Sequence, residues 1–245
     1  MTQALAARTA WITGAGTGIG RAVALELAAA GMQLALSGRR REALESVQRE
    51  VLDQGGRCEI HVLDVADKAA VQGTAAEIQS GLGPVDLLVN CAGTNIANRK
   101  LSELTPEAWD EVVDVNLNGT LYPILAVLDG MRERGDGLLI SISSWVGRYP
   151  AAVTGAAYAA SKRALIALSE AINAEENPHG IRSCVICPAA VATEIMDKRP
   201  NPPSASERAS MLQPVDVARL VRFISEYPAR VCVNEIVMSP TRRTE

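Results

Sequence analysis

The chain has 245 residues, 48% of them hydrophobic and 3% aromatic, and a formal net charge of −4. This length allows one large α/β domain or two small ones, and the low aromatic content indicates a core packed mainly by aliphatic side chains. The acidic balance without a long basic segment argues against a nucleic-acid partner. No apolar run reaches the about 18 residues that cross a bilayer, and the N-terminus lacks a signal-peptide pattern, so we expect a cytoplasmic protein without a membrane partner.

The first predicted unit is a strand, a glycine-rich turn and a helix. Residues 9–13 form a short apolar run, the glycine-rich segment 14–20 follows, and a helix is predicted over 21–30. Glycines let a pyrophosphate approach the backbone, and the free N–H groups and positive dipole at the start of a helix attract it. The turn therefore predicts a dinucleotide-binding site, although methyltransferases carry similar turns.

A second strand is predicted over 32–37, and three arginines follow Gly38, namely Arg39, Arg40 and Arg41. They stand at the start of a helix that we expect to run to residue 54. Cations at a helix N-terminus oppose its dipole, at a cost of about 0.3–1 kcal/mol each. A bound phosphate would remove this conflict, whereas the alternative is a solvated helix surface.

Strands and helices alternate along the rest of the chain. We expect strands over 59–63, 85–89, 137–144, 182–187 and 231–238, and helices over 68–80, 105–116, 119–134, 158–176 and from 214 onward. This alternation predicts one domain over 1–245, an α/β fold with a Rossmann-like, doubly wound parallel sheet and helices on both faces. Residues 194–210 are polar and proline-rich and too long for an ordinary connection, so we expect a substrate lid or a mobile loop.

The cysteines and histidines do not predict a metal site. The five cysteines are scattered and mostly lie in apolar runs, which is typical of reduced core residues. Cys184 and Cys187 have the spacing of a redox or metal motif, but residues three apart in a strand face opposite sides. His61 and His179 are too few to complete a zinc site, so we expect no metal.

Tyr158 and Lys162 lie four residues apart in a predicted helix, so their side chains share one face. A phenol with a pKa of about 10 is a poor acid or base at neutral pH unless a nearby positive charge stabilises its phenolate. Lys162 is placed to be that charge, which makes Tyr158 a candidate general acid–base; a chance pair on a solvated helix is the alternative. Ser143 and Ser144 end a central strand, where open α/β sheets place their ligands.

Together these motifs resemble the short-chain dehydrogenase/reductase family over essentially the whole chain. The segment 13–20 is similar to the family's cofactor loop, and the segment 90–93 to its N-N-A-G sequence. Asn116 is similar to its helix-four asparagine, and Tyr158 and Lys162 match its Y-x-x-x-K motif.

The resemblance implies an oxidoreductase that interconverts a secondary alcohol and a ketone or aldehyde by hydride transfer at nicotinamide C4. Tyr158 would exchange a proton with the substrate oxygen, Lys162 would hold the nicotinamide ribose, and Asn116 would hold a water. We assign the role of polarising the carbonyl to Ser144, which makes Ser143 a structural residue. The alternative is that Ser143 has the catalytic role. The residues expected to contact the cofactor are Gly14, Thr17, Gly18, Ile19, Gly20, Arg39, Arg40, Asp64, Val65, Asn90, Ala92, Gly93, Tyr158, Lys162, Pro188, Val191 and Thr193.

Cofactor preference is predicted from the end of the second strand. Enzymes that prefer NAD usually carry an acid where this chain has Gly38, because its carboxylate binds the ribose hydroxyls and repels a 2′-phosphate. Arg39, assisted by Arg40, would attract that phosphate. We therefore expect NADP(H) to be preferred over NAD(H).

The substrate is a small molecule whose identity the sequence does not indicate. Its pocket is expected to involve Thr94, Ile96, Trp145, Tyr149 and Met196, together with Ser144 and the lid. The resemblance also implies a homotetramer, or a homodimer, packed through helices 105–134 and 158–176 and the last strand.

Two other functions remain as alternatives. The first is a catalytically silent dinucleotide-binding regulator, against which the four predicted catalytic residues count. The second is a methyltransferase, which would need an acid after the second strand and has no use for the tyrosine–lysine pair.

Overall fold

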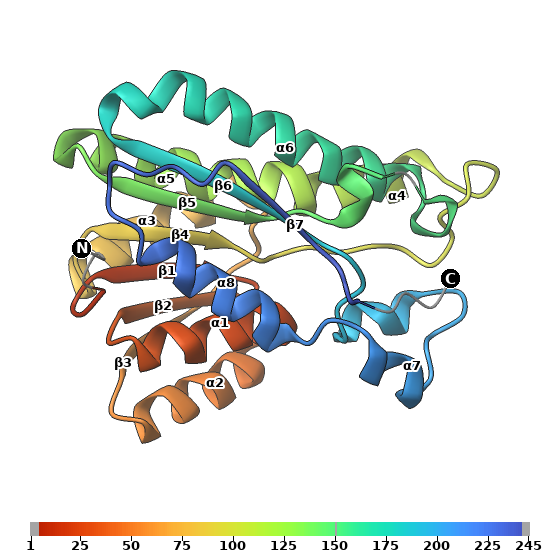
Figure 1. Cartoon of the computed structure of the whole chain (residues 1–245), viewed down its shortest axis with the longest axis horizontal. Helices are drawn as coiled ribbons and strands as arrows, with labels where there is room; N and C mark the ends of the chain where they lie inside the picture. Colours follow the sequence, from red (N-terminus) through yellow and green to blue (C-terminus); the bar gives the residue numbers. More distant parts are fainter. Residues whose placement is uncertain (1–4, 150, 242–245) are drawn as a thin grey trace.

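The computed structural model describes residues 5–149 and 151–241, which form a parallel sheet between two layers of helices (Figure 1). The predicted α/β fold with a doubly wound sheet is confirmed. The strands are β1 (Thr9–Thr13), β2 (Gln33–Gly38), β3 (Arg57–Val62), β4 (Val85–Asn90), β5 (Gly137–Ile142), β6 (Ile181–Pro188) and β7 (Glu235–Met238). The helices are α1 (Gly18–Ala29), α2 (Arg41–Asp53), α3 (Lys68–Gly81), α4 (Pro106–Val113), α5 (Gly119–Arg134), α6 (Ala156–Glu176), α7 (Ala205–Ser210) and α8 (Pro214–Ser225).

The strand order is β3-β2-β1-β4-β5-β6-β7, so the direction of winding reverses between β1 and β4. These two strands pair in parallel, and Thr13 lies opposite Asn90 at their carboxyl ends. Loops leave this point toward opposite faces of the sheet, which opens a crevice where ligands bind in such folds. The glycine turn after β1 and the segment after β4 both begin there.

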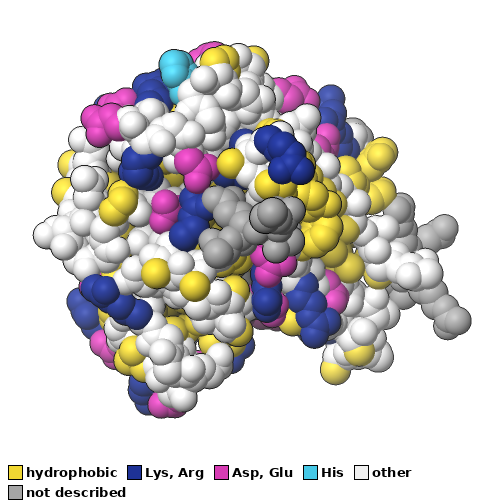
Figure 2. Space-filling model, turned by 60° about the vertical axis from the view of Figure 1, so that its left-hand side comes forward, with side chains coloured by type: hydrophobic (Ala, Val, Ile, Leu, Met, Phe, Trp, Pro, Cys, Tyr) yellow, Lys and Arg dark blue, Asp and Glu magenta, His cyan; other side chains and the backbone are white. Residues whose placement is uncertain are grey.

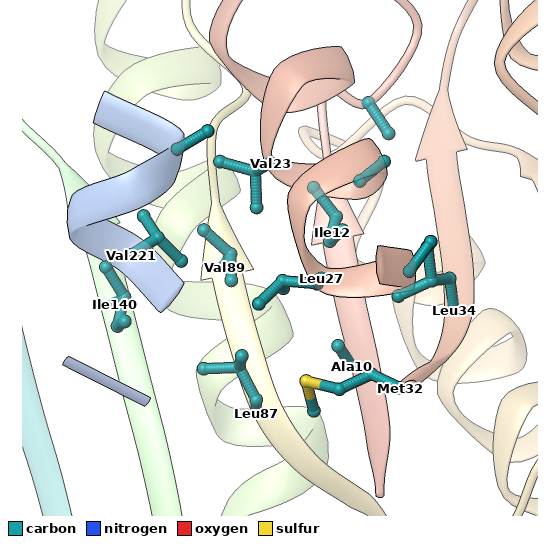
Figure 3. Close-up of a cluster of buried hydrophobic side chains, with 14 of the residues drawn as sticks. Ala10, Ile12, Val23, Leu27, Met32, Leu34, Leu87, Val89, Ile140 and Val221 are labelled. Atoms are coloured by element: carbon teal, nitrogen blue, oxygen red, sulfur yellow. The ribbon is translucent and has the colours of Figure 1, made fainter. Parts of the chain in front are cut away.

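Alternate residues of the central strands point to opposite faces of the sheet, where each face packs against its own hydrophobic cluster. Ile12 of β1 and Val89 of β4 are fully buried against Leu27 of α1 and Val221 of α8 on one face (Figure 3). Trp11 points to the other face, into a second cluster built with α3, α5 and α6. Burial on both faces explains why these strands are continuous apolar runs in the sequence. It also fixes the register that brings the strand ends together.

The strand predicted over 137–144 ends at Ile142, so Ser143 and Ser144 follow it instead of ending it. Three further segments differ from the sequence prediction. The last strand begins at Glu235 and not at residue 231, because the chain first makes a turn in which Val231 N–H donates to Pro228 O. Between α4 and α5 the chain forms a π-helical segment, η1 (Asp114–Asn118), and not a regular helix end.

The third difference lies in residues 194–210, which contain the 3₁₀ segment η5 (Glu194–Lys198) and helix α7. Ser204 and Glu207 form a capping box at the start of α7, a signal that the proline-rich composition obscured. The side chain of Arg208 bonds to Asp197 and, at 3.2 Å, to Thr193 O, so α7 is attached to η5. A role of this segment as a lid stays a prediction.

Within the described residues, no helix is both long enough and apolar enough to cross a membrane. On the face drawn in Figure 2, basic and acidic side chains are interspersed, and no continuous basic area is visible. Such a surface offers nucleic acid no extended positive field on that face.

Candidate active site

The glycine turn between β1 and α1 is tightly packed. Gly14 has a φ of 62°, and a Cβ atom there would lie 2.7 Å from the backbone nitrogen of Ala92. A Cβ at Gly20 would lie 2.3 Å from Gly14 O. Thr17 precedes α1, but among the described residues its side chain makes no capping hydrogen bond. The first N–H groups of α1 are therefore available to an anion, as the sequence predicts.

A cavity of about 1240 Å³ extends from the start of α2, past the glycine turn, to Tyr158 and η5. All of the residues predicted to contact the cofactor line it except Asn90. The Asn90 side chain is buried, and its amide has no hydrogen-bond partner among the described residues. The cavity is large enough for a dinucleotide with a small substrate beside it.

The arginines after β2 form one end of the cavity. Arg40 donates to Glu194 Oε2 at 2.8 Å and to Thr17 Oγ1 at 3.1 Å. Arg39 is more loosely held, with a nitrogen 3.9 Å from Asp64 Oδ2 and a side chain that is 64% exposed. Arg39 can therefore turn toward a ligand at little cost in lost contacts.

Lys162 is buried beneath the cavity. Its ammonium donates to Ile142 O at 2.8 Å and lies 5.8 Å from the centre of the Tyr158 ring. Burial lowers the pKa of Lys162 to about 8, because the charged form loses its hydration. The side chain is thus fixed at the end of β5, next to the phenol.

In the protein without a cofactor, Lys162 is not among the groups that shift the pKa of Tyr158, and a lowered pKa with a cationic cofactor bound stays a prediction. Burial raises the pKa of Tyr158, and the groups that oppose this rise are the Ser144 hydroxyl, Arg199 and Arg99. The physical reason is that the phenolate would lose hydration in the cavity, while the Lys162 ammonium is directed at Ile142 O.

The two serines after β5 have different surroundings. Ser143 is buried, and its hydroxyl donates to Lys162 O at 2.7 Å. Ser144 lines the cavity with Tyr158, and its Oγ accepts from Val146 N–H at 3.4 Å. Ser143 also lines the cavity, but its hydroxyl hydrogen is used in the bond to Lys162 O, whereas the Ser144 hydroxyl interacts with Tyr158.

Asn116 lies in the π-helical segment below the cavity and does not line it. Its Oδ1 accepts from Thr94 N–H at 2.7 Å, and its Nδ2 donates to Thr94 O and to Ser161 Oγ, both at 3.1 Å. A Cβ atom at Gly93 would lie 3.4 Å from both Asn116 Oδ1 and Lys162 Nζ. Asn116 thus supports the loop beside Lys162, and a water held there stays a prediction.

The substrate end of the cavity differs in part from the prediction. Trp145 and Met196 line it, whereas Thr94, Ile96 and Tyr149 are not among its lining residues. Tyr149 is half exposed, and its ring packs against Trp145 outside the lining, with the ring centres 4.3 Å apart.

Sequence reasoning missed two residues that line this end, Asn95 and Arg99, whereas Lys198 and Arg199 lie in the segment 194–210 that was expected to shape the pocket but were not singled out. They come from the loops after β4 and β6, and no local motif marks them. For the three cations, the available signal was their position in loops that follow the carboxyl ends of strands.

Cys184 and Cys187 belong to different hydrophobic clusters, on opposite faces of the sheet. Burial raises the pKa of Cys184 to about 12 and that of Cys187 to about 11. Both are thiols at neutral pH, which makes them poor nucleophiles and metal ligands.

Comparisons with known proteins agree with this geometry. A family model described as short chain dehydrogenase matches residues 8–203. The chain is 35% identical to glycine betaine reductase ATRR of Emericella nidulans over 96% of its own length, but this match spans only 19% of that protein.

Two solved structures share the fold over nearly their whole length. A metagenomic short-chain oxidoreductase in complex with NADP has a TM-score of 0.85 and 29% identity, covering 98% of this chain and 100% of that one. An alcohol dehydrogenase from Thermococcus sibiricus, complexed with 5-hydroxy-NADP, has a TM-score of 0.86 and 31% identity, covering 97% and 99%.

Proposed function

The chain belongs to the short-chain dehydrogenase family, and we propose that it is an NADP(H)-dependent oxidoreductase that interconverts a secondary alcohol and a ketone or aldehyde. The observation that carries this proposal is the convergence of Ser144, Tyr158 and Lys162 on the cavity that the glycine turn enters. A nicotinamide cofactor, when bound, supplies the hydride.

The protein's own residues would handle the proton and the substrate oxygen. In the reductive direction, the Ser144 hydroxyl donates a hydrogen bond to the carbonyl oxygen, and Tyr158 transfers its phenolic proton to that oxygen as charge develops. The raised pKa of Tyr158 keeps the phenol protonated before reaction. Lys162 holds a positive charge beside the phenolate that results, and the loop supported by Asn116 keeps the site in place.

The residues present fit a phosphorylated dinucleotide. The uncapped start of α1 and the close packing at Gly14 suit a pyrophosphate. Arg39 and Arg40 stand at the far end of the same cavity, where no acidic side chain follows β2 directly. This arrangement supports NADP(H) over NAD(H), and the solved relatives with NADP-type ligands are consistent with it.

We also propose a cytoplasmic homotetramer or homodimer. The apolar side chains of Trp109 on α4 and Leu125 on α5 are 37% and 50% exposed. Exposed apolar groups on helices from one layer are suited to a helix-to-helix interface between copies.

The experiment that tests the function is incubation of the protein with NADPH and a panel of ketones and aldehydes, with nucleotide oxidation as the readout. Turnover of at least one carbonyl compound supports the enzyme. A dinucleotide-binding regulator, the alternative, would bind NADPH and give no turnover with any member of the panel. A parallel titration of NADPH binding separates a regulator from an inactive preparation.

A further inference from the structure

Three cations gather at the substrate end of the cavity. Arg99, from the loop after β4, and Lys198 and Arg199, from the end of η5, line the same cavity as Ser144 and Tyr158. In the described part of the chain, none of the three forms an ion pair with a carboxylate. This end of the cavity therefore carries positive charge without a protein counter-ion.

Arg99 is held in place by three loops. It is only 7% exposed, and its guanidinium donates to Ile96 O at 2.8 Å, Val153 O at 3.4 Å and Lys198 O at 2.6 Å. Gly155, with a φ of 80°, lets the chain pass close by, since a Cβ atom there would lie 2.6 Å from Arg99 Cβ. Carbonyl acceptors satisfy donors but do not neutralise the charge. Because a guanidinium has five N–H donors, two remain for a ligand.

The acidic residues that line the cavity have other partners. Asp64 lies near Arg39, and Glu194 pairs with Arg40. Glu207 accepts from Ser204 N–H at 2.7 Å as part of the α7 cap. Among the described residues, none of these three carboxylates forms an ion pair with Arg99, Lys198 or Arg199.

The cations also act on one another and on the reacting phenol. Burial lowers the pKa of Arg99, and repulsion by Arg199 lowers it further. Both guanidinium groups favour the ionised form of Tyr158. Lys198 Nζ donates to Thr94 Oγ1 at 2.8 Å, which directs it toward the loop that carries Arg99. An anion between these groups would relieve their repulsion.

We propose that the substrate carries a carboxylate, bound by Arg99, Lys198 and Arg199, while its carbonyl or alcohol carbon lies beside Tyr158. The substrate class is then an oxo acid and the corresponding hydroxy acid. This inference rests on the proposed function. A carboxylate presents two oxygens to the two remaining N–H groups of a fixed guanidinium. A phosphate can be bound in the same way, so the test includes a phosphorylated ketone.

The test compares matched acids and esters. With NADPH, kcat/KM is measured for 4-oxopentanoate and acetoacetate and for their methyl esters, which have the same carbonyl without the charge. We expect the acids to be favoured at least about 10-fold, as one charge-assisted hydrogen bond supplies. Lys198→Gln and Arg199→Gln should each reduce kcat/KM for the acids, mainly by raising KM. The reduction for the acids should be at least about 5-fold larger than the reduction for the esters. Lys68→Gln, which replaces an exposed lysine at the start of α3, is the matched control. It should change kcat/KM neither for the acids nor for the esters.

Several outcomes would overturn the inference while leaving the oxidoreductase intact. Equal kcat/KM for acids and esters would do so, as would a preference for dihydroxyacetone phosphate over every acid. An Arg199→Gln variant with a raised KM for NADPH and an unchanged acid preference would assign the cations to the cofactor.

A binding measurement separates this failure from failure of the proposed function. If no carbonyl compound is turned over, calorimetric binding of 4-oxopentanoate and of its methyl ester is compared in the presence of NADP. Tighter binding of the acid that weakens in Arg199→Gln supports the anion site even in a protein without activity. Equal binding of acid and ester overturns it.

Discussion

The Ser143 hydroxyl donates a 2.7 Å hydrogen bond to the backbone carbonyl oxygen of Lys162, which attaches the end of β5 to the helix that carries Tyr158. The ammonium of the same lysine donates to Ile142 O at 2.8 Å. Two hydrogen bonds therefore join strand and helix directly behind the reacting groups. Ser144 does not take part in them and faces the cavity.

The first prediction separates the two serines. Ser144→Ala should lower kcat about 100-fold, because it removes a donor to the developing oxyanion, with little change in the free energy of unfolding. Ser143→Ala should lower the free energy of unfolding by about 1 kcal/mol, because it removes a buried hydrogen bond. Steady-state kinetics and thermal unfolding of both variants check this. The opposite assignment, with activity lost mainly in Ser143→Ala, would exchange their roles.

The second prediction concerns proton transfer. Tyr158→Phe should lower kcat by about 10²–10⁴-fold, because the variant lacks the proton that the substrate oxygen receives. The Kd for NADPH should stay close to that of the unmodified protein, since the ring remains. Tyr149→Phe is the matched control, because that phenol stacks on Trp145 outside the cavity lining. Near-native kcat in Tyr158→Phe would refute the mechanism.

The third prediction concerns the stability cost of Lys162. Its pKa is about 8 in the folded protein, against an ordinary value of 10.5. Between these values the unfolded chain binds more protons than the folded one, so this group makes stability rise as the pH increases from about 8 to about 10.5. Below pH 8 the full cost applies, on the order of 3 kcal/mol from a difference of about 2.5 pKa units.

Lys162→Met should therefore raise the Tm of the free protein at pH 7, and the difference from the unmodified protein should shrink toward pH 10.5. Activity should be lost, because the phenolate no longer has its neighbouring charge. Thermal unfolding of both proteins across this pH range is the measurement. A variant that is less stable at pH 7 would mean that the hydrogen bond to Ile142 O outweighs the cost of burial.

The fourth prediction concerns assembly. Light scattering at micromolar concentration should give a mass two or four times that of the chain. Leu125→Glu, at an exposed position of α5, should shift the measured mass toward that of the monomer, because it places a charge in the proposed interface. Leu52→Glu, exposed at the end of α2, is the matched control and should leave the mass unchanged. A monomeric unmodified protein would contradict the proposed assembly.

The parts of the site that the sequence predicts are those set by local geometry. A strand, a glycine turn and a helix place the anion site, and a four-residue spacing places Tyr158 beside Lys162, because both relations depend on neighbouring residues. The fold follows for a similar reason, since alternating apolar strands and helices leave few ways to wind a parallel sheet.

The parts that the sequence does not predict depend on contacts between distant segments. Arg99 and Lys198 are 99 residues apart, and their contact exists only after three loops have packed together. Burial raises the pKa of Tyr158 in the protein without a cofactor, and the sequence could not predict this, because desolvation depends on how the loops enclose the phenol. The stack of Tyr149 on Trp145 likewise could not be read from spacing.

The last prediction concerns cofactor choice at the end of β2. Arg40 is already engaged by Glu194 and Thr17, whereas Arg39 has a single loose ion pair, 3.9 Å from Asp64. Arg39 is therefore the guanidinium that can bind a 2′-phosphate with the smaller loss of protein contacts. Gly38 can be replaced without strain, because its φ is not positive and a Cβ atom there would meet Leu44 at an ordinary 3.6 Å.

We expect kcat/KM for NADPH to exceed that for NADH at least about 10-fold, equivalent to about 1.4 kcal/mol. The double variant Gly38→Asp with Arg39→Ala should reverse this order, because a carboxylate at position 38 accepts hydrogen bonds from ribose hydroxyls and repels a phosphate. Arg41→Ala is the matched control: this arginine pairs with Glu45 on α2, does not line the cavity, and should leave the ratio unchanged. Equal efficiency with both nucleotides in the unmodified protein would refute the role of Arg39, since a guanidinium that binds the 2′-phosphate must favour the nucleotide that carries it.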